Sequence, residues 1–332
     1  MSSIGWDIGG VNVKVARVAS DGPVQALTEP FSIEHDAERL FAVLERLGRR
    51  VGVDGGRHAV TMTAELSQRF RSKAEGVGFV LDALEQAFPG VAMLVLDTTG
   101  RFRSPAEARA HPIDVSASNW TATAMVVAAE HADVILLDMG STTTDIIPIE
   151  SGRIQPLGRT DPDRLASGEL VYSGALRTPV EALVRQVPWR GGMALVSADD
   201  FAHTADVHLW LGTRLIALDQ AGPGDTSRAR AGERLARVVC ADRTMIDDEG
   251  ITSIAAHIAE AQVAAITAAV VRVRSRHPRL ERAAVLGLGA PIAERAARAA
   301  GLAIIPMDTE WSDDASRAAP AVAVARLLEG HP

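Results

Sequence analysis

Cysteine, aromatic residues and long apolar runs are scarce in this chain of 332 residues. The single cysteine, Cys240, excludes an internal disulfide and favours a reducing, intracellular compartment. The opening MSSIGWDIGG lacks the basic and apolar regions of a signal peptide, and the apolar run 263–271 is too short to cross a bilayer. We therefore expect a cytoplasmic protein with no membrane partner.

Basic residues are also outnumbered, with 34 Lys and Arg against 42 Asp and Glu, which gives a formal net charge of −8. A protein that follows a nucleic-acid backbone needs clustered positive charge, so no nucleic-acid partner is expected. Hydrophobic residues make up 47% and charged residues 23%, the balance of an ordinary globular protein. The length favours two lobes, and a homodimer stays open.

Strand patterns alternate with helix patterns along the chain, which predicts an α/β fold with a largely parallel sheet in at least the second half. From 149 to about 192 the pattern weakens, and that segment is predicted as loops and short elements around a site, or as a loop-rich insertion. The expected strands are 4–8, 11–18, 24–31, 58–63, 91–96, 134–137, 146–149 and 283–288. The main expected helices are 36–48, 73–88, 119–131, 199–209, 229–239, 251–274, 291–300 and 316–328.

One pattern occurs twice, 131 positions apart: a strand, then Asp-x-Gly, then small or polar residues, then a second strand. The two copies are residues 7–14 and 138–145. Glycine allows a tight turn whose N–H groups reach an anion, and hydroxyls and a lysine add donors. We expect the two hairpins to face one another as a clamp for phosphate or diphosphate. A Mg²⁺ ion held mostly through water would suit Asp7 and Asp138 at the strand ends.

A third glycine turn, Gly287-Leu288-Gly289, joins a predicted strand to a predicted helix and could also meet an anion. The sequence contains no G-x-x-x-x-G-K-[S/T] and no G-x-S-x-G, so P-loop NTPases and serine hydrolases lose their main support. The predicted phosphate-binding residues are Gly9, Gly10, Asn12, Lys14, Gly140, Ser141, Thr142, Thr143, Thr144, Gly287 and Gly289.

Two phosphate hairpins and a late glycine turn resemble the acetate kinase/sugar kinase/heat-shock-protein/actin superfamily, which implies a two-lobed, ribonuclease H-like α/β fold with a central cleft. A closer resemblance is to the hydantoinase/oxoprolinase-like family labelled tetrahydromethanopterin-linked C1 transfer pathway protein. It rests on the strings GWDIGG (5–10), MTAEL (62–66), SNW (118–120), DMGSTTTDIIP (138–148), RTD (159–161), GELVY (168–172), RTP (177–179), TADV (204–207), RLAR (234–237) and CAD (240–242).

That resemblance implies an enzyme of methanofuran synthesis, a transferase that releases diphosphate. It would join an aminomethylfuran-methanol diphosphate to the phenol of γ-glutamyltyramine, or of a tyrosine counterpart, as an aryl ether. The diphosphate needs neutralisation by the clamp and Mg²⁺. The phenol, with a free pKa of ~10, needs a base, for which Glu65, Glu169 and Asp145 are the candidates. The candidate substrate residues are Asn119, Arg159, Asp161, Arg164, Tyr172 and Arg177.

Two alternatives remain open from the sequence. One is an ATP-dependent small-molecule kinase or hydantoinase-like amidohydrolase of the same superfamily, and the other is a non-catalytic nucleotide-sensing module. The predicted division is an N-terminal lobe over 1–117, a C-terminal lobe over 118–310, and a C-terminal helix within 311–332 that could return to the first lobe.

Overall fold

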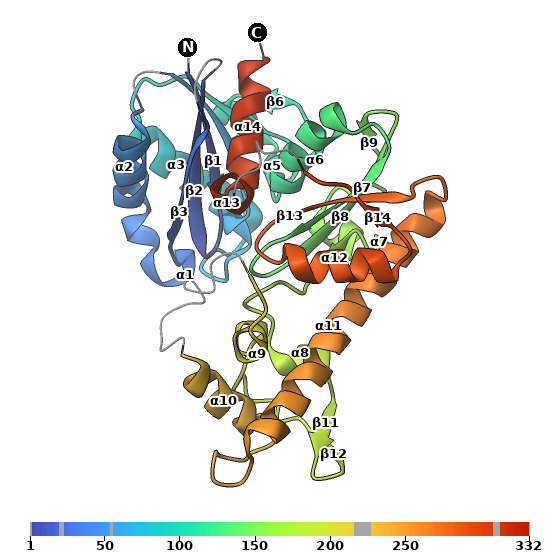
Figure 1. Cartoon of the computed structure of the whole chain (residues 1–332). Coiled ribbons are helices and arrows are strands. Elements are labelled where there is room, and N and C mark those ends of the chain that lie inside the picture. The colour runs from blue at the N-terminus through green and yellow to red at the C-terminus, as the bar shows by residue number, and fades with distance from the viewer. Residues whose placement is uncertain (1, 20–22, 54–55, 216–226, 308–312, 332) are drawn as a thin grey trace. The chain divides into compact units, whose positions relative to one another are not determined.

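The computed structural model describes residues 2–19, 23–53, 56–215, 227–307 and 313–331. Contacts divide the chain into two compact units, each built from separate segments (Figure 1). Unit 1 comprises Met1–Asp133, Ile149–Arg164 and Met307–Pro332. Unit 2 comprises Val134–Pro148 and Leu165–Pro306.

Unit 1 contains a six-stranded sheet in the order β3-β2-β1-β4-β5-β6. Strands β1, β2 and β3 are antiparallel neighbours, β1, β4 and β5 run parallel, and β6 turns back along β5. The strands are β1 (Ser2–Ile8), β2 (Asn12–Ala19), β3 (Gln25–Pro30), β4 (Arg57–Met62), β5 (Met93–Leu96) and β6 (Phe102–Arg103).

Helix α2 of unit 1 buries one apolar face, as its sequence periodicity requires. In α2 the stripe Leu40, Val43, Leu44 and Leu47 is buried, and Gly52 ends the helix with a φ of 69°. The helical segments are α1 (Ile33–Asp36), η1 (Ala37–Arg39), α2 (Leu40–Val51), η2 (Ala64–Leu66), α3 (Lys73–Ala87), α4 (Pro105–Ala110), α5 (Pro112–Val115), α6 (Asn119–Glu130), α13 (Asp313–Arg317) and α14 (Ala319–Glu329).

The C-terminal helix α14 lies against strands β1, β2 and β4 of the same unit (Figure 1). Its approach to β1 requires glycine at position 5, because a Cβ atom there would overlap the backbone oxygen of Ala321 and lie 2.8 Å from the nitrogen of Ala325. Helix α6 also packs against α14. Residues 118–133 therefore belong to unit 1, which differs from the boundary drawn at 118 from the sequence. The boundary drawn at 310/311 falls outside the described residues.

Unit 2 repeats the strand order of unit 1. Its main sheet runs β10-β8-β7-β13-β14, the counterpart of β3-β2-β1-β4-β5, and β7, β13 and β14 are parallel. The strands are β7 (Val134–Met139), β8 (Thr144–Glu150), β10 (Leu170–Val171), β13 (Arg282–Leu286) and β14 (Ala303–Ile304). The last residues of β8 pair with β9 (Arg153–Ile154), which belongs to unit 1.

A smaller second core in unit 2 lies around a two-stranded hairpin, β11 (Gln186–Trp189) and β12 (Gly192–Leu195). It is formed mainly with α8 (Val180–Leu183), α9 (Thr204–Leu211), α10 (Arg228–Arg237) and α11 (Asp248–Arg276). The remaining helices are α7 (Asp161–Ser167), which begins in unit 1 and ends in unit 2, and α12 (Ala290–Ala299).

Among the described helices, α11 alone is long and apolar enough to cross a membrane by length and composition. Its buried residues belong to both hydrophobic clusters of unit 2, with Ile251, Ile254 and Ile258 in one and Ile266 and Val270 in the other. We therefore interpret α11 as a core helix that connects the two clusters.

Candidate active site

The first predicted hairpin, β1–β2, brings Asp7 and Lys14 together. The two residues are directly opposite in the antiparallel register, and Lys14 Nζ lies 3.0 Å from Asp7 Oδ2. Thr61 Oγ1 on the neighbouring β4 donates to Asp7 Oδ1 at 3.3 Å. The Asp7 carboxylate is thus buried but paired, with a cation already beside it.

The turns of the two hairpins are closed in the same way. In unit 1 the N–H of Gly9 donates to the Asn12 carbonyl at 2.9 Å, and in unit 2 the N–H of Gly140 donates to the Thr143 carbonyl at 2.9 Å. These bonds fall at positions 131 residues apart, so the repeat seen in the sequence is confirmed as a repeat of local structure. Whether the two turns face one another concerns the placement of two separate units and stays a prediction.

In both turns, backbone carbonyl oxygens accept hydrogen bonds, whereas several backbone N–H groups donate to no acceptor in the described structure. The Gly10 carbonyl accepts from Ile33 N–H, and the Ser141 carbonyl accepts from Leu176 and Arg177 N–H, at 2.9–3.0 Å. Within the described ranges, no acceptor takes the N–H groups of Gly10, Val11, Ser141 or Thr142. Turns with unused N–H groups are suited to an anion.

The hydroxyl run of the second turn divides into two kinds of residue. Thr144 is fully buried and its Oγ1 donates to the Ser173 carbonyl at 2.7 Å, so this hydroxyl holds β8 to the following segment. The phosphate role of Thr144 stays a prediction. Ser141, Thr142 and Thr143 are half-buried and stay candidates.

The third glycine turn lies next to the second hairpin, within unit 2. Leu286 at the end of β13 is paired with Asp138, and the N–H of Gly289 donates to the Met139 carbonyl at 3.0 Å. Gly287 has a φ of 91°, and a Cβ atom there would lie 2.6 Å from Asp138 Oδ1. Only glycine fits at this position, and the close approach places the turn against the predicted metal residue of unit 2.

Glu65 is the candidate base with the most altered acidity. It lies in η2, just after β4, and its side chain is fully buried. Burial raises its pKa from 4.5 to about 7, although Lys73 and the backbone N–H groups of Glu65 and Ala117 lower it and Asp161 raises it. Lys73 Nζ lies 3.8 Å from Glu65 Oε1 and 3.2 Å from Asp161 Oδ2. A carboxyl with a pKa near neutrality can accept a proton under ordinary conditions.

The backbone around Glu65 is unusually close-fitting. A Cβ atom at Gly76 on α3 would lie 2.6 Å from the Cα of Glu65, so glycine lets α3 approach η2. Ala117, just before α6, has a φ of 49°, a left-handed conformation that costs a residue with a side chain about 1–3 kcal/mol. Strained backbone of this kind is commonly kept at functional sites.

Comparisons with known proteins show the family of this chain. Residues 57–331 match the family model described as hydantoinase/oxoprolinase. The chain belongs to the hydantoinase/oxoprolinase family. It is 36% identical, over 98% of its length and 97% of the relative, to the (4-{4-[2-(gamma-L-glutamylamino)ethyl]phenoxymethyl}furan-2-yl)methanamine synthase of Methanocaldococcus jannaschii. It is also 31% identical, over 59% of its length and 90% of the relative, to the enzyme of the same name from Methanococcus vannielii.

A solved structure supports the fold of this family member. The ROK family glucokinase of Streptomyces griseus aligns over 98% of this chain and 99% of its own, with a TM-score of 0.51 and 14% identity. Such low identity carries the fold alone. The predicted α/β fold is confirmed, and it is similar to the fold of this sugar kinase.

The other two candidate bases, Glu169 and Asp145, belong to unit 2, whereas the Glu65 cluster belongs to unit 1. Glu169 is buried and Arg276 Nη2 lies 3.4 Å from its Oε1, while the Ile146 N–H donates to its backbone carbonyl. Asp145 is buried in β8, opposite Leu170 of β10. Asp145 and Glu169 therefore lie near each other, where β8 pairs with β10 in unit 2.

The six predicted substrate residues also divide between the units. In unit 2, Tyr172 and Arg177 are exposed. In unit 1, Asn119 is the first residue of α6, after the N-cap residue Ser118, and Asp161 joins the Glu65 cluster through Lys73. Arg164 is buried with its guanidinium 4.2 Å from the Trp120 ring centroid. This stacking gives Arg164 a packing contact, and its contact with the substrate stays a prediction.

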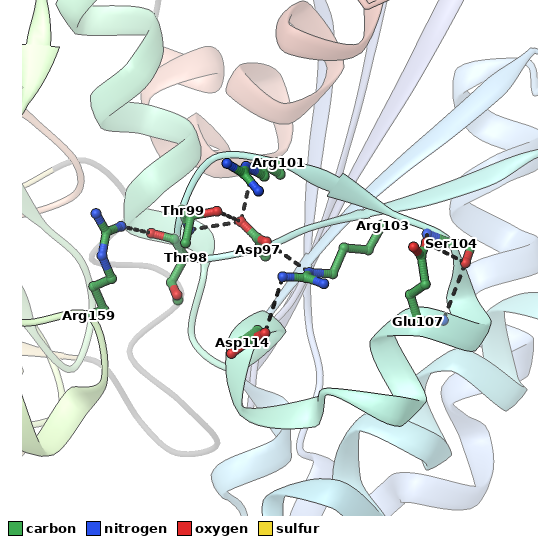
Figure 2. A network of polar contacts seen from close by, with 9 residues as sticks. All are labelled: Asp97, Thr98, Thr99, Arg101, Arg103, Ser104, Glu107, Asp114 and Arg159. Atoms are coloured by element: carbon green, nitrogen blue, oxygen red, sulfur yellow. Dashed lines mark hydrogen bonds and ion pairs between the residues drawn. The ribbon is translucent and has the colours of Figure 1, made fainter.

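Arg159 contacts a hydrogen-bonded turn of unit 1 (Figure 2). Its Nη1 donates to the Thr98 carbonyl at 2.8 Å. The turn is organised by buried Asp97, which accepts from Thr99 Oγ1 at 2.6 Å and from Arg103 Nε at 2.8 Å. Burial opposes ionisation of Asp97, but these bonds and the Arg101 N–H hold its pKa below the ordinary value. Arg159 is therefore an anchoring contact as well as a candidate substrate residue.

Sequence reasoning missed Lys73 and Thr61, which contact candidate site carboxylates, and Gly76, which lies against the backbone of Glu65. The sequence pattern identifies Lys73 only as the first residue of the helix predicted over 73–88, and Gly76 only as a residue within that helix. The composition held one usable signal for Lys73. Apart from Lys14, it is the only lysine in the sequence, among 34 basic residues.

Proposed function

We propose that this chain is an ether-forming transferase of methanofuran-type cofactor synthesis. Its substrates would be an aminomethylfuran-methanol diphosphate and the phenol of a γ-glutamyl tyramine or tyrosine, with diphosphate as the second product. The substrate class follows from the near full-length similarity to a synthase whose name describes a phenoxymethylfuran. The reaction type follows from the same similarity, and the buried Glu65, with a pKa of about 7, fits the general base that ether formation requires.

The reaction exchanges one C–O bond for another. The bond between the furfuryl methylene and the diphosphate oxygen breaks, and its electron pair leaves with the diphosphate. The phenolic oxygen forms the new bond to the methylene carbon. The phenolic proton passes to the Glu65 carboxylate. A base with a pKa near 7 can accept this proton because the phenol becomes more acidic in the transition state.

The turns supply the electrostatic part of the proposal. Charge develops on the leaving diphosphate, and N–H groups and a lysine aimed at that charge stabilise it more than they stabilise the substrate. The N–H groups of Gly10 and Val11 in unit 1, and of Ser141 and Thr142 in unit 2, are available for this in the described structure. We propose that each turn binds diphosphate oxygens.

We also propose Mg²⁺ as the cofactor, with Asp7 and Asp138 as its residues. Both Asp7 oxygens have a partner, Thr61 on one and Lys14 on the other, so direct coordination would compete with Lys14. A carboxylate oxygen has lone pairs left for metal-bound water, and this donor set fits a hydrated ion held through water. When bound, the ion would supply neutralisation of the diphosphate charge.

The test is incubation of the purified protein with the furan diphosphate and candidate phenols. The ether product is identified by mass spectrometry, and the released diphosphate is quantified. Glu65→Gln is expected to lower the rate by roughly 10²–10⁴-fold, the contribution of a positioned general base. Glu169→Gln is the comparison variant, since Glu169 is an equally buried carboxylate paired with Arg276. No ether from the wild type, or equal losses in the two variants, would contradict the proposal.

A further inference from the structure

The sequence contains only two lysines, and their positions indicate a role at the candidate site. Lys14 and Lys73 are the only lysines among 34 basic residues, so nearly every surface cation is an arginine. Both lysines contact buried carboxylates of the candidate site, Lys14 at Asp7 and Lys73 at Glu65. A compact ammonium differs from a planar guanidinium in hydration and geometry, so the two are not interchangeable beside a carboxylate.

Lys73 lies between two carboxylates of unit 1. Its Nζ is 3.2 Å from Asp161 Oδ2 and 3.8 Å from Glu65 Oε1, so the ammonium is nearer to Asp161. Asp161 and Lys73 are each about one-fifth exposed, whereas Glu65 is fully buried. The cation is thus shared between a partly solvated carboxylate and one that has no contact with water.

The position of Lys73 is fixed by its helix. It is the first residue of α3, directly after the N-cap Ser72, whose Oγ accepts from the Glu75 N–H at 3.2 Å. One turn later Gly76 holds α3 against the backbone of Glu65. The ammonium is therefore held near Glu65 by the packing of α3 as well as by charge.

The two neighbours act on Glu65 with opposite sign. Among the described residues, the charged groups that act on it are Lys73 from α3, which favours the carboxylate, and Asp161 from α7, which favours the neutral acid. The backbone N–H groups of Glu65 and Ala117 favour the carboxylate. Loss of Asp161 removes a repulsion and also releases Lys73 toward Glu65, so both effects favour ionisation.

We propose that Lys73 and Asp161 are positioning residues that set, in opposite directions, the pH at which Glu65 becomes a base. The inference rests on the proposed role of Glu65 in accepting the phenolic proton. Neither residue need touch the substrate, because each acts through the Glu65 carboxyl.

The first test is the pH dependence of ether formation. Lys73→Met should move the rising limb of kcat/KM upward by about one pH unit or more, since an opposite charge at this range shifts a pKa by about 1–3. Asp161→Asn should move it downward. Lys73→Arg should keep most of the wild-type position, and Asp163→Asn, a change two residues away whose carboxylate bonds to Thr160, should not move it.

The second test reads the protonation of Glu65 without turnover. The free energy of unfolding is measured against pH for the wild type, Lys73→Met and Asp161→Asn, each with and without Glu65→Gln. The difference within each pair gives the midpoint pH of Glu65 ionisation. Relative to the wild-type midpoint, the Lys73→Met midpoint should be higher and the Asp161→Asn midpoint lower. If Lys73→Met does not fold, Asp161→Asn still gives a signed result.

Midpoints that move in the same direction, or do not move, would overturn the proposal. If the midpoints move apart but Glu65→Gln keeps full activity, the electrostatic arrangement is supported and the role of Glu65 in the proposed reaction fails. The two failures are therefore distinguishable.

Discussion

At the scale of single residues, unit 1 buries two titratable side chains whose pKa values shift in opposite directions. Burial is the main cause in both cases: it raises the pKa of Glu65 to about 7 and lowers the pKa of His58 to about 4. His58 packs between Trp6 and Phe88, with ring centroids 6.1 and 4.8 Å from its own. The neutral form of each side chain is the one that the folded state favours.

The first prediction concerns Glu65 above pH 4.5. Its folded pKa exceeds the unfolded value, so its stabilising effect is complete below pH 4.5 and is lost as pH rises through about 7. Glu65→Gln removes this loss. Relative to the wild type, the variant should gain about 3 kcal/mol of unfolding free energy between pH 4.5 and 8, measured by chemical denaturation. A gap independent of pH would contradict the burial of an ionisable Glu65.

The second prediction concerns His58 at acid pH. Its folded pKa lies below the ordinary 6.5, so its stabilising effect is present above pH 6.5 and is lost as pH falls toward 4. The wild type should lose about 3 kcal/mol from this residue over that range, and His58→Leu should not. Parallel denaturation profiles of the two proteins would show that His58 protonates without cost.

Glu65 was identifiable as a candidate from the sequence, but its acidity was not. The position after a strand and the family string MTAEL indicated the residue. Its pKa depends on Asp161, 96 positions further along the chain, and on the packing of α3 at Gly76. Contacts of that separation leave no local pattern, which is also why the stacking of Arg164 on Trp120 was missed.

At the scale of elements, α3 contains two glycines with opposite surroundings. A Cβ atom at Gly76 would clash with the Glu65 backbone, whereas a Cβ atom at Gly78 would have no atom within 4 Å. Gly78→Ala should therefore stabilise the protein by about 0.5–1 kcal/mol through helix propensity. Gly76→Ala should destabilise it by roughly 1–3 kcal/mol through overpacking.

The measurement is the denaturation midpoint of the two variants, made in parallel at one pH. Because both changes add the same methyl group to the same helix, each serves as the control for the other. Equal effects would mean that α3 does not fit closely against η2.

Elements whose signals are local were the ones that the sequence predicted well. The hairpins follow from glycine turns between apolar strands, and both were found at the expected residues. The assignment of α6 and of residues 149–164 to unit 1 was not predictable. It depends on α14 packing against α6 and on Arg159 reaching Thr98, contacts between distant parts of the sequence.

At the scale of the whole molecule, two units share one strand order and one turn geometry, a duplication that suits a ligand with several phosphate groups. The synthase proposal needs only a diphosphate there, whereas a kinase must also bind adenine and ribose. We predict that diphosphate with Mg²⁺ protects the protein against thermal unfolding at least as well as ATP with Mg²⁺. A ligand at a hundredfold excess over its Kd adds about 2.7 kcal/mol, which is readily measured.

The same titrations decide between the synthase and the ATP-dependent alternative. Strong protection by ATP with none by diphosphate, together with ADP formation on adding a hydroxyl acceptor, would favour a kinase. A nucleotide sensor would bind ATP and form neither ADP nor ether.

The packing of α14 on β1 has a consequence for how the chain matures on the ribosome. Strand β1 is made more than 300 residues before the helix that covers it at Gly5. The last segment of unit 2 ends at Pro306, directly before the last segment of unit 1 begins at Met307. Nascent unit 1 therefore exposes the α14-facing side of its first strands throughout translation, and closing that surface is a long-range step of the kind that folds slowly. Chaperone contacts during synthesis are expected to concentrate on β1 and to end when residues 319–329 leave the exit tunnel.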